Sequence, residues 1–272
     1  MDESTEIKII KSELEKLKNG VYEIIEFIED SDEYQYQIDK DIKRHFYHLF
    51  IKCKRNFKAI NILMESQDLE NSYIEATVLL RVLTEGYLHL CYLIKAEKDV
   101  VIEEYKAMSE FQLQKMLRGT NRQYKLKINN KTDLKIIRRL KNEILKKEIK
   151  LPYHFEKMHS LAKKTDNQVF YGAIYQMFNT YVHFNPTTYI SYGTEDENGT
   201  FNFDSYKPKP FLEARILYFS ISVQMTLLAR TMKYLEIEKT TKNIINHFNE
   251  WDTFLNKKKR GRIILSNTDD YI

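Results

Sequence analysis

Helix-breaking residues are scarce in this chain, and their placement limits what it can fold into. The 272 residues include only 7 glycines and 4 prolines. Pro186, Pro208 and Pro210 fall within one short stretch, and Pro152 is the fourth. An all-β fold needs frequent turn signals, which are mostly glycine and proline. The sequence therefore predicts long helices with one main interruption, between residues 186 and 210.

Apolar residues recur with helical spacing along most of the chain. They make up 43% of the sequence together with the aromatic residues, enough for a sizeable core. The segment 71–97 is apolar almost all round, so we expect it at the centre of the protein. The periodicity predicts helices over 5–29, 37–66, 71–97, 100–117, 132–149, 154–164, 166–185, 210–235 and 239–256.

One segment has a different period. Residues 187–205, "TTYISYGTEDENGTFNFDS", alternate on both sides of a polar turn at Asn198-Gly199, which predicts a β-hairpin. The predicted fold class is all-α, a bundle of long antiparallel helices with one β-hairpin inserted near 187–205. We expect a single helical domain over residues 1–256, followed by a basic, flexible tail at 257–272.

The sequence also indicates a cellular location. Cys53 and Cys91 lie far apart inside helical patterns, as small buried residues do in a reducing compartment. The N-terminus, "MDESTEIKII", has no apolar run after a basic start, which argues against a signal peptide. The longest apolar stretch, at 216–229, is too short and too polar to span a bilayer. We therefore expect a cytoplasmic protein without a membrane partner.

Charge is unevenly distributed. The net charge is +4, but residues 115–150 contain thirteen Lys and Arg against three acidic residues, and residues 1–40 contain twelve acidic residues against five basic ones. A concentrated positive block, which here includes Arg138 and Arg139, can attract the phosphates of a nucleic acid. The alternative is a solvated face that pairs with the acidic N-terminal helix.

The central segment 71–97 carries a polar stripe. Arg81, Glu85 and His89 are spaced four residues apart, so they share one face of the helix. Buried charges are costly unless they are paired. Arg81 and Glu85 could form an ion pair within their helix, or they could face a functional cleft. Glu85 and His89 also have metal-ligand spacing, but no third ligand is indicated.

A second polar stripe lies in "YQMFNTYVHFNP", residues 175–186, where Pro186 should end a helix. Tyr175, Asn179 and His183 are again four residues apart. One interpretation is a site in which this stripe faces the stripe of the central helix. The other is that His183 is a helix C-terminal histidine that bonds to the last carbonyls.

Common catalytic motifs are absent from the sequence. It has no P-loop, GxGxxG, nucleophile elbow or CxxC, which excludes the usual ATPase, dehydrogenase and serine hydrolase sites. "RHFYHLF" places Arg44 four residues before His48, which we interpret as a surface or interface stripe. We expect no metal and no cofactor.

Two motifs resemble those of a bacterial family of uncharacterised helical proteins. "YIEATVLLRVLTEGYLHLCYLI", at 73–94, resembles its pattern "LLRSLFEAYVNLLYL", with Arg81 and Glu85 at the Arg and Glu. "YQMFNTYVHFNP" resembles its signature "YRxLSxYVHxS", although Asn179 replaces the Ser and Gln176 replaces the Arg. The resemblance runs from about residue 40 to 190 and leaves the hairpin and the helices of 210–256 outside. The matching positions of the signature are Tyr175, Tyr181, Val182 and His183.

That family in turn resembles HEPN domains (higher eukaryotes and prokaryotes nucleotide-binding), which are helical bundles. Many of these are metal-independent ribonucleases of toxin–antitoxin, CRISPR and phage-defence systems. Their signature is an Arg, a polar residue that is often Asn, three variable residues and a His. Asn179 and His183 match it, but Phe178 occupies the Arg position. Arg81 could supply the missing guanidinium from the neighbouring helix.

The resemblance implies a metal-independent endoribonuclease of a phage-defence or toxin system. A neutral His183 would take the proton from an RNA 2′-hydroxyl, Arg81 would hold the phosphate, and Asn179 would orient either group. The alternative is a non-catalytic HEPN-like binding module or regulatory subunit that recognises a protein or a nucleotide. The predicted catalytic residues are Arg81, Glu85, Asn179 and His183, and the predicted binding residues are Tyr175, Tyr181, Arg138 and Arg139.

The same resemblance implies partners. HEPN sites commonly form between two protomers, so we expect a homodimer. The other expected partners are RNA and a protein encoded in the same operon.

Overall fold

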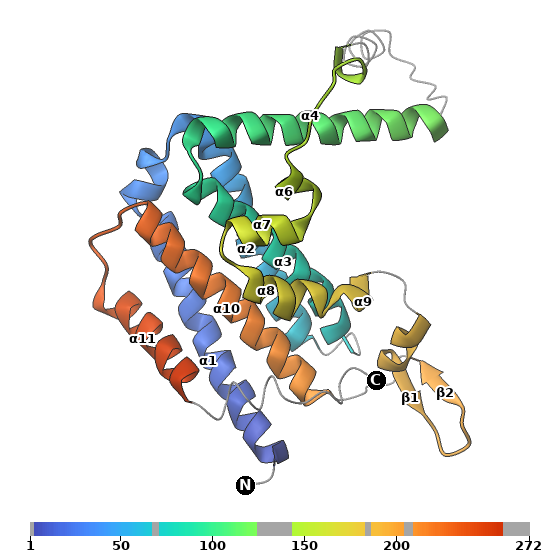
Figure 1. The fold of residues 1–272 in the computed structure, drawn as a ribbon. Helices are drawn as coiled ribbons and strands as arrows, with labels where there is room; N and C mark the ends of the chain where they lie inside the picture. Colours follow the sequence, from blue (N-terminus) through green and yellow to red (C-terminus); the bar gives the residue numbers. More distant parts are fainter. Residues whose placement is uncertain (1–2, 67–70, 124–142, 183–185, 204–208, 258–272) are drawn as a thin grey trace, which may run out of the picture.

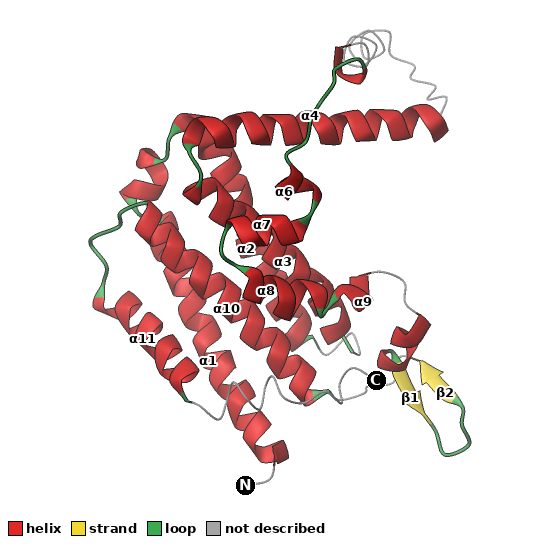
Figure 2. Ribbon diagram, in the orientation of Figure 1, coloured by secondary structure: helices red, strands yellow, loops and turns green. Residues whose placement is uncertain are grey.

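The structure is a computed structural model of the whole chain, and it describes residues 3–66, 71–123, 143–182, 186–203 and 209–257. Long helices dominate it, with one small two-stranded sheet (Figure 2). The predicted all-α class with an inserted hairpin is therefore confirmed. The long helices are α1 (Glu3–Glu29), α2 (Lys40–Glu65), α3 (Tyr73–Lys95), α4 (Lys98–Gln123), α10 (Pro210–Tyr234) and α11 (Lys242–Asn256).

The short helices are the π-helical turns η1 (Glu33–Gln37) and η2 (Tyr171–Gln176), the 3-10 helix η3 (Pro186–Ser191), and α6 (Tyr153–Glu156), α7 (Met158–Lys164), α8 (Gln168–Phe170) and α9 (Asn179–Val182).

Helix α3 lies at the centre of the bundle, as its apolar composition predicts. It packs against α2 and α10, α10 packs in turn against α1, and α11 covers the outer side of α1 (Figure 1). Leu80, Leu83, Tyr87 and Leu90 of α3 are all buried in the core. Helix α4 runs across one end of this bundle (Figure 1).

A glycine sets how closely α2 and α3 approach each other. A Cβ atom added at Gly86 would lie only 2.9 Å from Sγ of Cys53 on α2. Both residues are buried. The small side chain therefore lets the two helices pack tightly, and it fixes the positions of the residues that flank this contact.

The helix expected over 166–185 is interrupted. The chain forms the short α8, the π-helical turn η2 and then α9. Asn167, just before α8, accepts a hydrogen bond from Oη of Tyr87 at 2.6 Å and donates to the carbonyl of Thr165 at 2.6 Å. Tertiary contacts thus hold a wider turn than an α-helix has, which shifts the side chains after it out of a straight stripe.

Two further predicted helices also differ. The segment 154–164 divides into α6 and α7, because Lys157 between them has an extended backbone with φ of −131°. The helix expected over 132–149 lies outside the described residues up to residue 142. The basic tail at 258–272 lies outside them as well.

The hairpin forms where the sequence places its turn. Strands β1 (Gly193–Glu195) and β2 (Phe201–Phe203) pair antiparallel, with Thr194 opposite Asn202. In the turn, Oδ1 of Asp196 accepts the backbone N–H groups of Asn198 and Thr200 at 2.9 and 2.8 Å. Gly199 adopts a φ of +77°, which favours glycine. The hairpin is shorter than expected, because η3 occupies its first part.

Two described helices, α3 and α10, are long and apolar enough to cross a membrane by length and composition. The stretch 216–229, which alone is too short to cross a membrane, is the middle of α10. The complete helix is long enough. Within the bundle, 61% of the most apolar 18-residue segment of α3 is buried, and 83% of that of α10. Central helices of a bundle have the same composition, so the cytoplasmic location stays a prediction.

Candidate functional site

Arg81 on α3 meets Tyr175 of η2. The guanidinium carbon of Arg81 lies 4.0 Å from the centre of the Tyr175 ring, a cation–π contact. The Tyr175 ring stacks on Tyr171, with 5.3 Å between centres and 18° between planes, and the ring of His159 on α7 lies 5.4 Å from Tyr171. The packing of η2 against α3 thus builds a short stack of flat groups with Arg81 at one end.

Arg81 has no acidic partner among the described residues. Its Nε atom is buried without a hydrogen bond, and no ion pair joins it to Glu85 one helical turn away. The internal ion pair considered in the sequence analysis is therefore wrong. A half-buried guanidinium is costly without a counter-charge, and none of the described residues supplies one, so an anion that binds Arg81 would lower that cost. We call Arg81, with the Tyr175 ring beneath it, the arginine clamp.

The remaining residues of the second stripe diverge. Asn179 begins α9 and is exposed, whereas Tyr181 is half-buried and packs against the core. Phe178 is only 1% exposed, so the position of the HEPN arginine is part of the hydrophobic core here. His183 lies outside the described residues, and so do Arg138 and Arg139.

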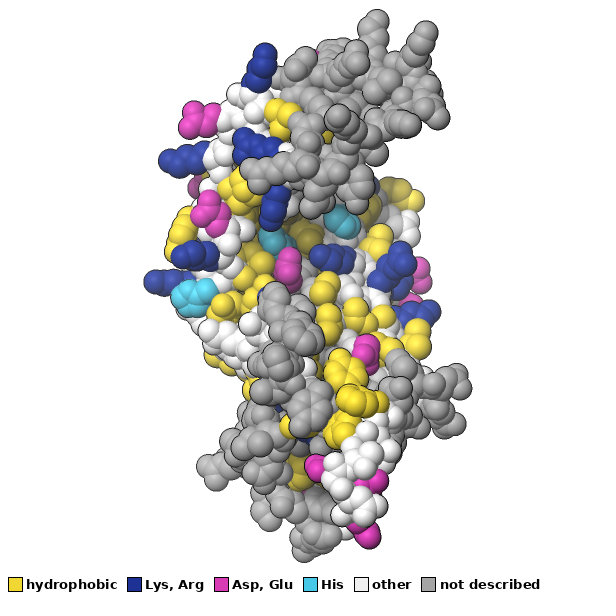
Figure 3. Space-filling model, turned by 90° about the vertical axis from the view of Figure 1, so that its right-hand side faces the viewer, with side chains coloured by type: hydrophobic (Ala, Val, Ile, Leu, Met, Phe, Trp, Pro, Cys, Tyr) yellow, Lys and Arg dark blue, Asp and Glu magenta, His cyan; other side chains and the backbone are white. Residues whose placement is uncertain are grey.

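Glu85 and His89, which follow Arg81 by one and two turns of α3, line a pocket that does not include Arg81. This pocket has a volume of about 760 Å³, and its walls come from α2, α3, α4, α6 and α7. Figure 3 shows basic and histidine side chains around a hollowed part of the face that carries α4. We call the pocket of about 760 Å³ the histidine pocket. Its lining residues are Arg44, His45, His48, Leu49, Lys52, Glu85, His89, Tyr105, Lys106, Met108, Ser109, Gln112, Phe155 and Met158.

Hydrogen bonds assign the tautomer of His89. Oη of Tyr105 donates to the backbone carbonyl of His89 at 3.0 Å and lies 3.3 Å from its Nδ1. We assign the hydroxyl proton to this bond, because a carbonyl can only accept. Nδ1 is then the donor to Oη, which leaves Nε2 as an acceptor. Burial lowers the pKa of His89 to about 4, with Lys52 and His154 acting in the same direction. His89 is therefore neutral at physiological pH.

The surroundings of His45 also favour its neutral form. Burial lowers its pKa, and the nearby Arg44 and His48 add to the effect. Its ring lies 5.2 Å from the ring of Tyr105, so it packs on the same wall as His89.

The sequence analysis noticed parts of this pocket without joining them. It treated the pair of Arg44 and His48 and the pair of Glu85 and His89 as separate weak motifs. Both pairs have i, i+4 spacing on neighbouring antiparallel helices, and that is the signal that could have linked them. His45, Tyr105 and Phe155 were missed, because nothing local distinguishes them from core aromatic residues.

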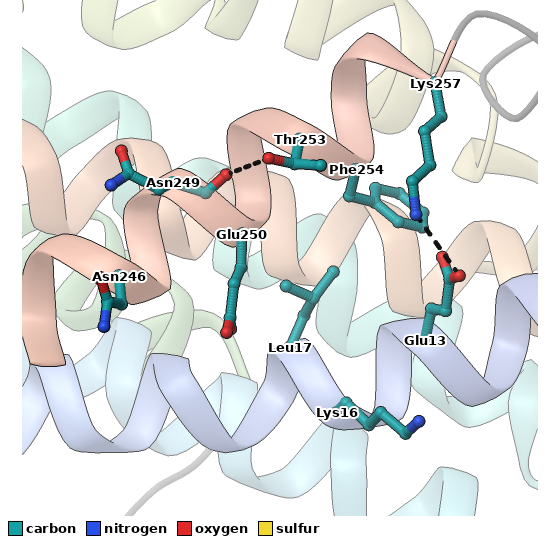
Figure 4. A pocket seen from close by; sticks show the side chains of 9 residues that line it. All are labelled: Glu13, Lys16, Leu17, Asn246, Asn249, Glu250, Thr253, Phe254 and Lys257. Atoms are coloured by element: carbon teal, nitrogen blue, oxygen red, sulfur yellow. Dashed lines mark hydrogen bonds and ion pairs between the residues drawn. The ribbon is translucent and has the colours of Figure 1, made fainter.

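Other pockets in the described part of the chain have a different charge balance. One of about 440 Å³ lies between α1 and α11, where Lys257 is paired with Glu13 at 3.6 Å (Figure 4). Its lining contains two lysines and two glutamates, so their charges cancel. A third pocket, beside α6, is lined by three glutamates and one lysine. Among the described residues, no group of three His, Cys, Asp or Glu side chains is placed to hold a metal ion.

Comparison with known protein families assigns the chain to a family. A model described as a family of unknown function, DUF5677, matches residues 43–201, more than half of the chain. The chain belongs to the DUF5677 family. The DUF5677 region includes the arginine clamp and every wall of the histidine pocket, and it also includes β1, which the sequence analysis placed outside the family-like core. No curated protein and no solved structure matches the chain.

Proposed function

We propose that this protein binds RNA at the arginine clamp and cleaves it as a metal-independent endoribonuclease of a phage-defence or toxin system. The observation that carries the proposal is the guanidinium of Arg81, which stacks on Tyr175 and has no ion pair with any of the described residues. Arginine planes and aromatic rings are the groups on which proteins stack unpaired RNA bases, and arginine is also the preferred phosphate ligand. Arg81 would replace the arginine that the HEPN signature has at the position of Phe178.

The chemistry requires few groups. A base removes the proton from a 2′-hydroxyl, the 2′-oxygen attacks the adjacent phosphorus, and the 5′-oxygen of the next nucleotide leaves with a proton. The products are a 2′,3′-cyclic phosphate and a 5′-hydroxyl. Arg81 would stabilise the charge that develops on the phosphate oxygens. His183 is the base that the resemblance implies, with Asn179 as its orienting partner.

A second candidate function is a non-catalytic HEPN-like module that binds RNA, a nucleotide or a protein of the same operon. The burial of Phe178 in the core favours it, because no arginine adjoins Asn179 in the chain. For either function we expect a homodimer.

The test compares Arg81→Gln with Arg55→Gln, a control on the exposed face of α2. Single-stranded RNA is incubated with each variant in EDTA, and the ends of the products are identified. We expect wild type and Arg55→Gln to release 2′,3′-cyclic phosphates, and Arg81→Gln to be slower by a factor of about 10² to 10³. His183→Ala should abolish cleavage.

Two results would decide against this function. Wild type that binds RNA through Arg81 without cutting it, alone or with its operon partners, would establish the binding module instead. Equal cleavage by wild type and Arg81→Gln would remove Arg81 from the mechanism.

A further inference from the structure

The positive side chains of the histidine pocket have no acidic partners among the residues that the structure describes. Lys52 is half-buried in its wall, and Arg44 and Lys106 lie at its rim. Within the described residues none of the three forms an ion pair or a hydrogen bond through its side chain. Other lysines of the same region are paired, since Lys54 contacts Glu29 and Lys98 contacts Asp39 at 2.6 Å. Three cations that no described residue pairs thus line the same pocket.

The pocket carries a net positive charge. Glu85 is the one carboxylate of its lining, and it forms no ion pair or hydrogen bond with the side chains of the described residues. With the buried histidines neutral, three cations face one anion. Such a site attracts an anion with at least two negative charges, and Glu85 remains free to accept a hydrogen bond from a hydroxyl or amino group of the same ligand.

Aromatic rings form one wall of the pocket. The ring centre of Tyr105 lies 5.3 Å from that of Phe155, and the ring of His89 lies 5.4 Å from Phe155. Tyr105 is buried behind this wall, and the half-buried Phe155 is the ring on which a flat ligand ring can pack. The volume of about 760 Å³ is in the range of pockets that bind small organic molecules.

We propose that the histidine pocket binds a small organic phosphate that carries a flat ring, with its phosphate against Lys52 and Arg44 and its ring against Phe155. The neutral Nε2 of His89 accepts a hydrogen bond from the ligand. This site is separate from the arginine clamp, and it does not require that the protein cleaves RNA.

The experiment measures binding by titration calorimetry to the full-length protein. The probes are adenosine monophosphate, inorganic phosphate, adenosine and a single-stranded trinucleotide RNA. Lys52→Gln removes the cation of the wall, and Lys54→Gln, on the same helix, is the matched control. Glu85→Gln removes the one negative charge of the pocket. Thermal unfolding of each variant checks that it is folded.

We expect the monophosphate to bind more tightly than either phosphate or adenosine, because it uses both halves of the pocket. Lys52→Gln should weaken its binding at least tenfold, Lys54→Gln should leave it unchanged, and Glu85→Gln should strengthen it severalfold. The gain in Glu85→Gln keeps the test decisive if Lys52→Gln unfolds.

Three outcomes would overturn the proposal. One is no binding of the monophosphate at millimolar concentration. Another is equal binding in wild type, Lys52→Gln and Glu85→Gln. The third is binding of the trinucleotide without the monophosphate, which would make the pocket part of an RNA path. Loss of RNA cleavage in Arg81→Gln with unchanged monophosphate binding would show that the two sites are independent.

Discussion

The contact between Gly86 and Cys53 gives a prediction about stability that can be worked out from one distance. In Gly86→Ala the new Cβ would lie 2.9 Å from the Cys53 sulfur, whereas non-bonded heavy atoms prefer about 3.5–4.0 Å. Overpacking of this kind costs about 1–3 kcal/mol. Replacing a glycine inside a helix by alanine returns about 1 kcal/mol. The substitution should therefore lower the free energy of unfolding by about 1 kcal/mol.

The double variant isolates the steric part. In a Cys53→Ala background the sulfur is absent, so Gly86→Ala should instead raise the free energy of unfolding by up to about 1 kcal/mol. The difference between the two backgrounds, measured by urea denaturation, is a coupling of about 1–3 kcal/mol. Equal stabilisation by Gly86→Ala in both backgrounds would refute the argument that this contact sets the spacing of α2 and α3.

Two further predictions concern pH and salt. Because burial lowers the pKa of His89 to about 4, below the 6.5 of an unperturbed histidine, the unfolded chain binds more protons between these values. The free energy of unfolding should fall by roughly 3 kcal/mol for this group as the pH is lowered from 6.5 to 4, and His89→Gln should remove that part of the slope in urea titrations at fixed pH. If the basic block at 115–150 contacts RNA phosphates, the logarithm of the RNA association constant should fall steeply with the logarithm of the salt concentration. Reversing several charges of the block should flatten that slope, and a salt-independent affinity would leave the block as a solvated surface.

The long helices were predictable because their cause is local. A repeat of apolar residues at every third or fourth position fixes the buried face, and the ends of α2, α3, α10 and α11 lie within a few residues of the predicted limits. The hairpin was predictable for a similar reason, since Asn198-Gly199 supplies the turn geometry itself.

The break between α8 and α9 was not predictable from local pattern. The residues 171–176 have no helix breaker other than Gly172, and the wide turn is accompanied by contacts from α3, namely Tyr87 with Asn167 and Arg81 with Tyr175. Such contacts join residues that are 80 and 94 positions apart in the sequence.

The candidate site also has some features that the sequence predicts and others that it does not. Helical spacing identified Arg81 and Tyr175 as members of two facing stripes, and the structure brings these two side chains into contact. It could not predict that Asn179 is exposed, because the π-helical turn intervenes. The histidine pocket escaped prediction because its walls come from five helices, and the register between α2, α3 and α4 depends on packing.

The orientation of the side chains near the arginine clamp depends on how many residues the π-helical turn η2 contains, as well as on which residues they are. Each residue of an α-helix turns the chain by about 100°, and a π-helical turn holds about one residue more than an α-helical turn. Removing a single residue from 171–174 would let the segment continue as an ordinary helix, and it would rotate Tyr175 and Asn179 together by about that angle relative to α8. Lineages of this chain should therefore tolerate many side-chain replacements in η2 more readily than one deletion.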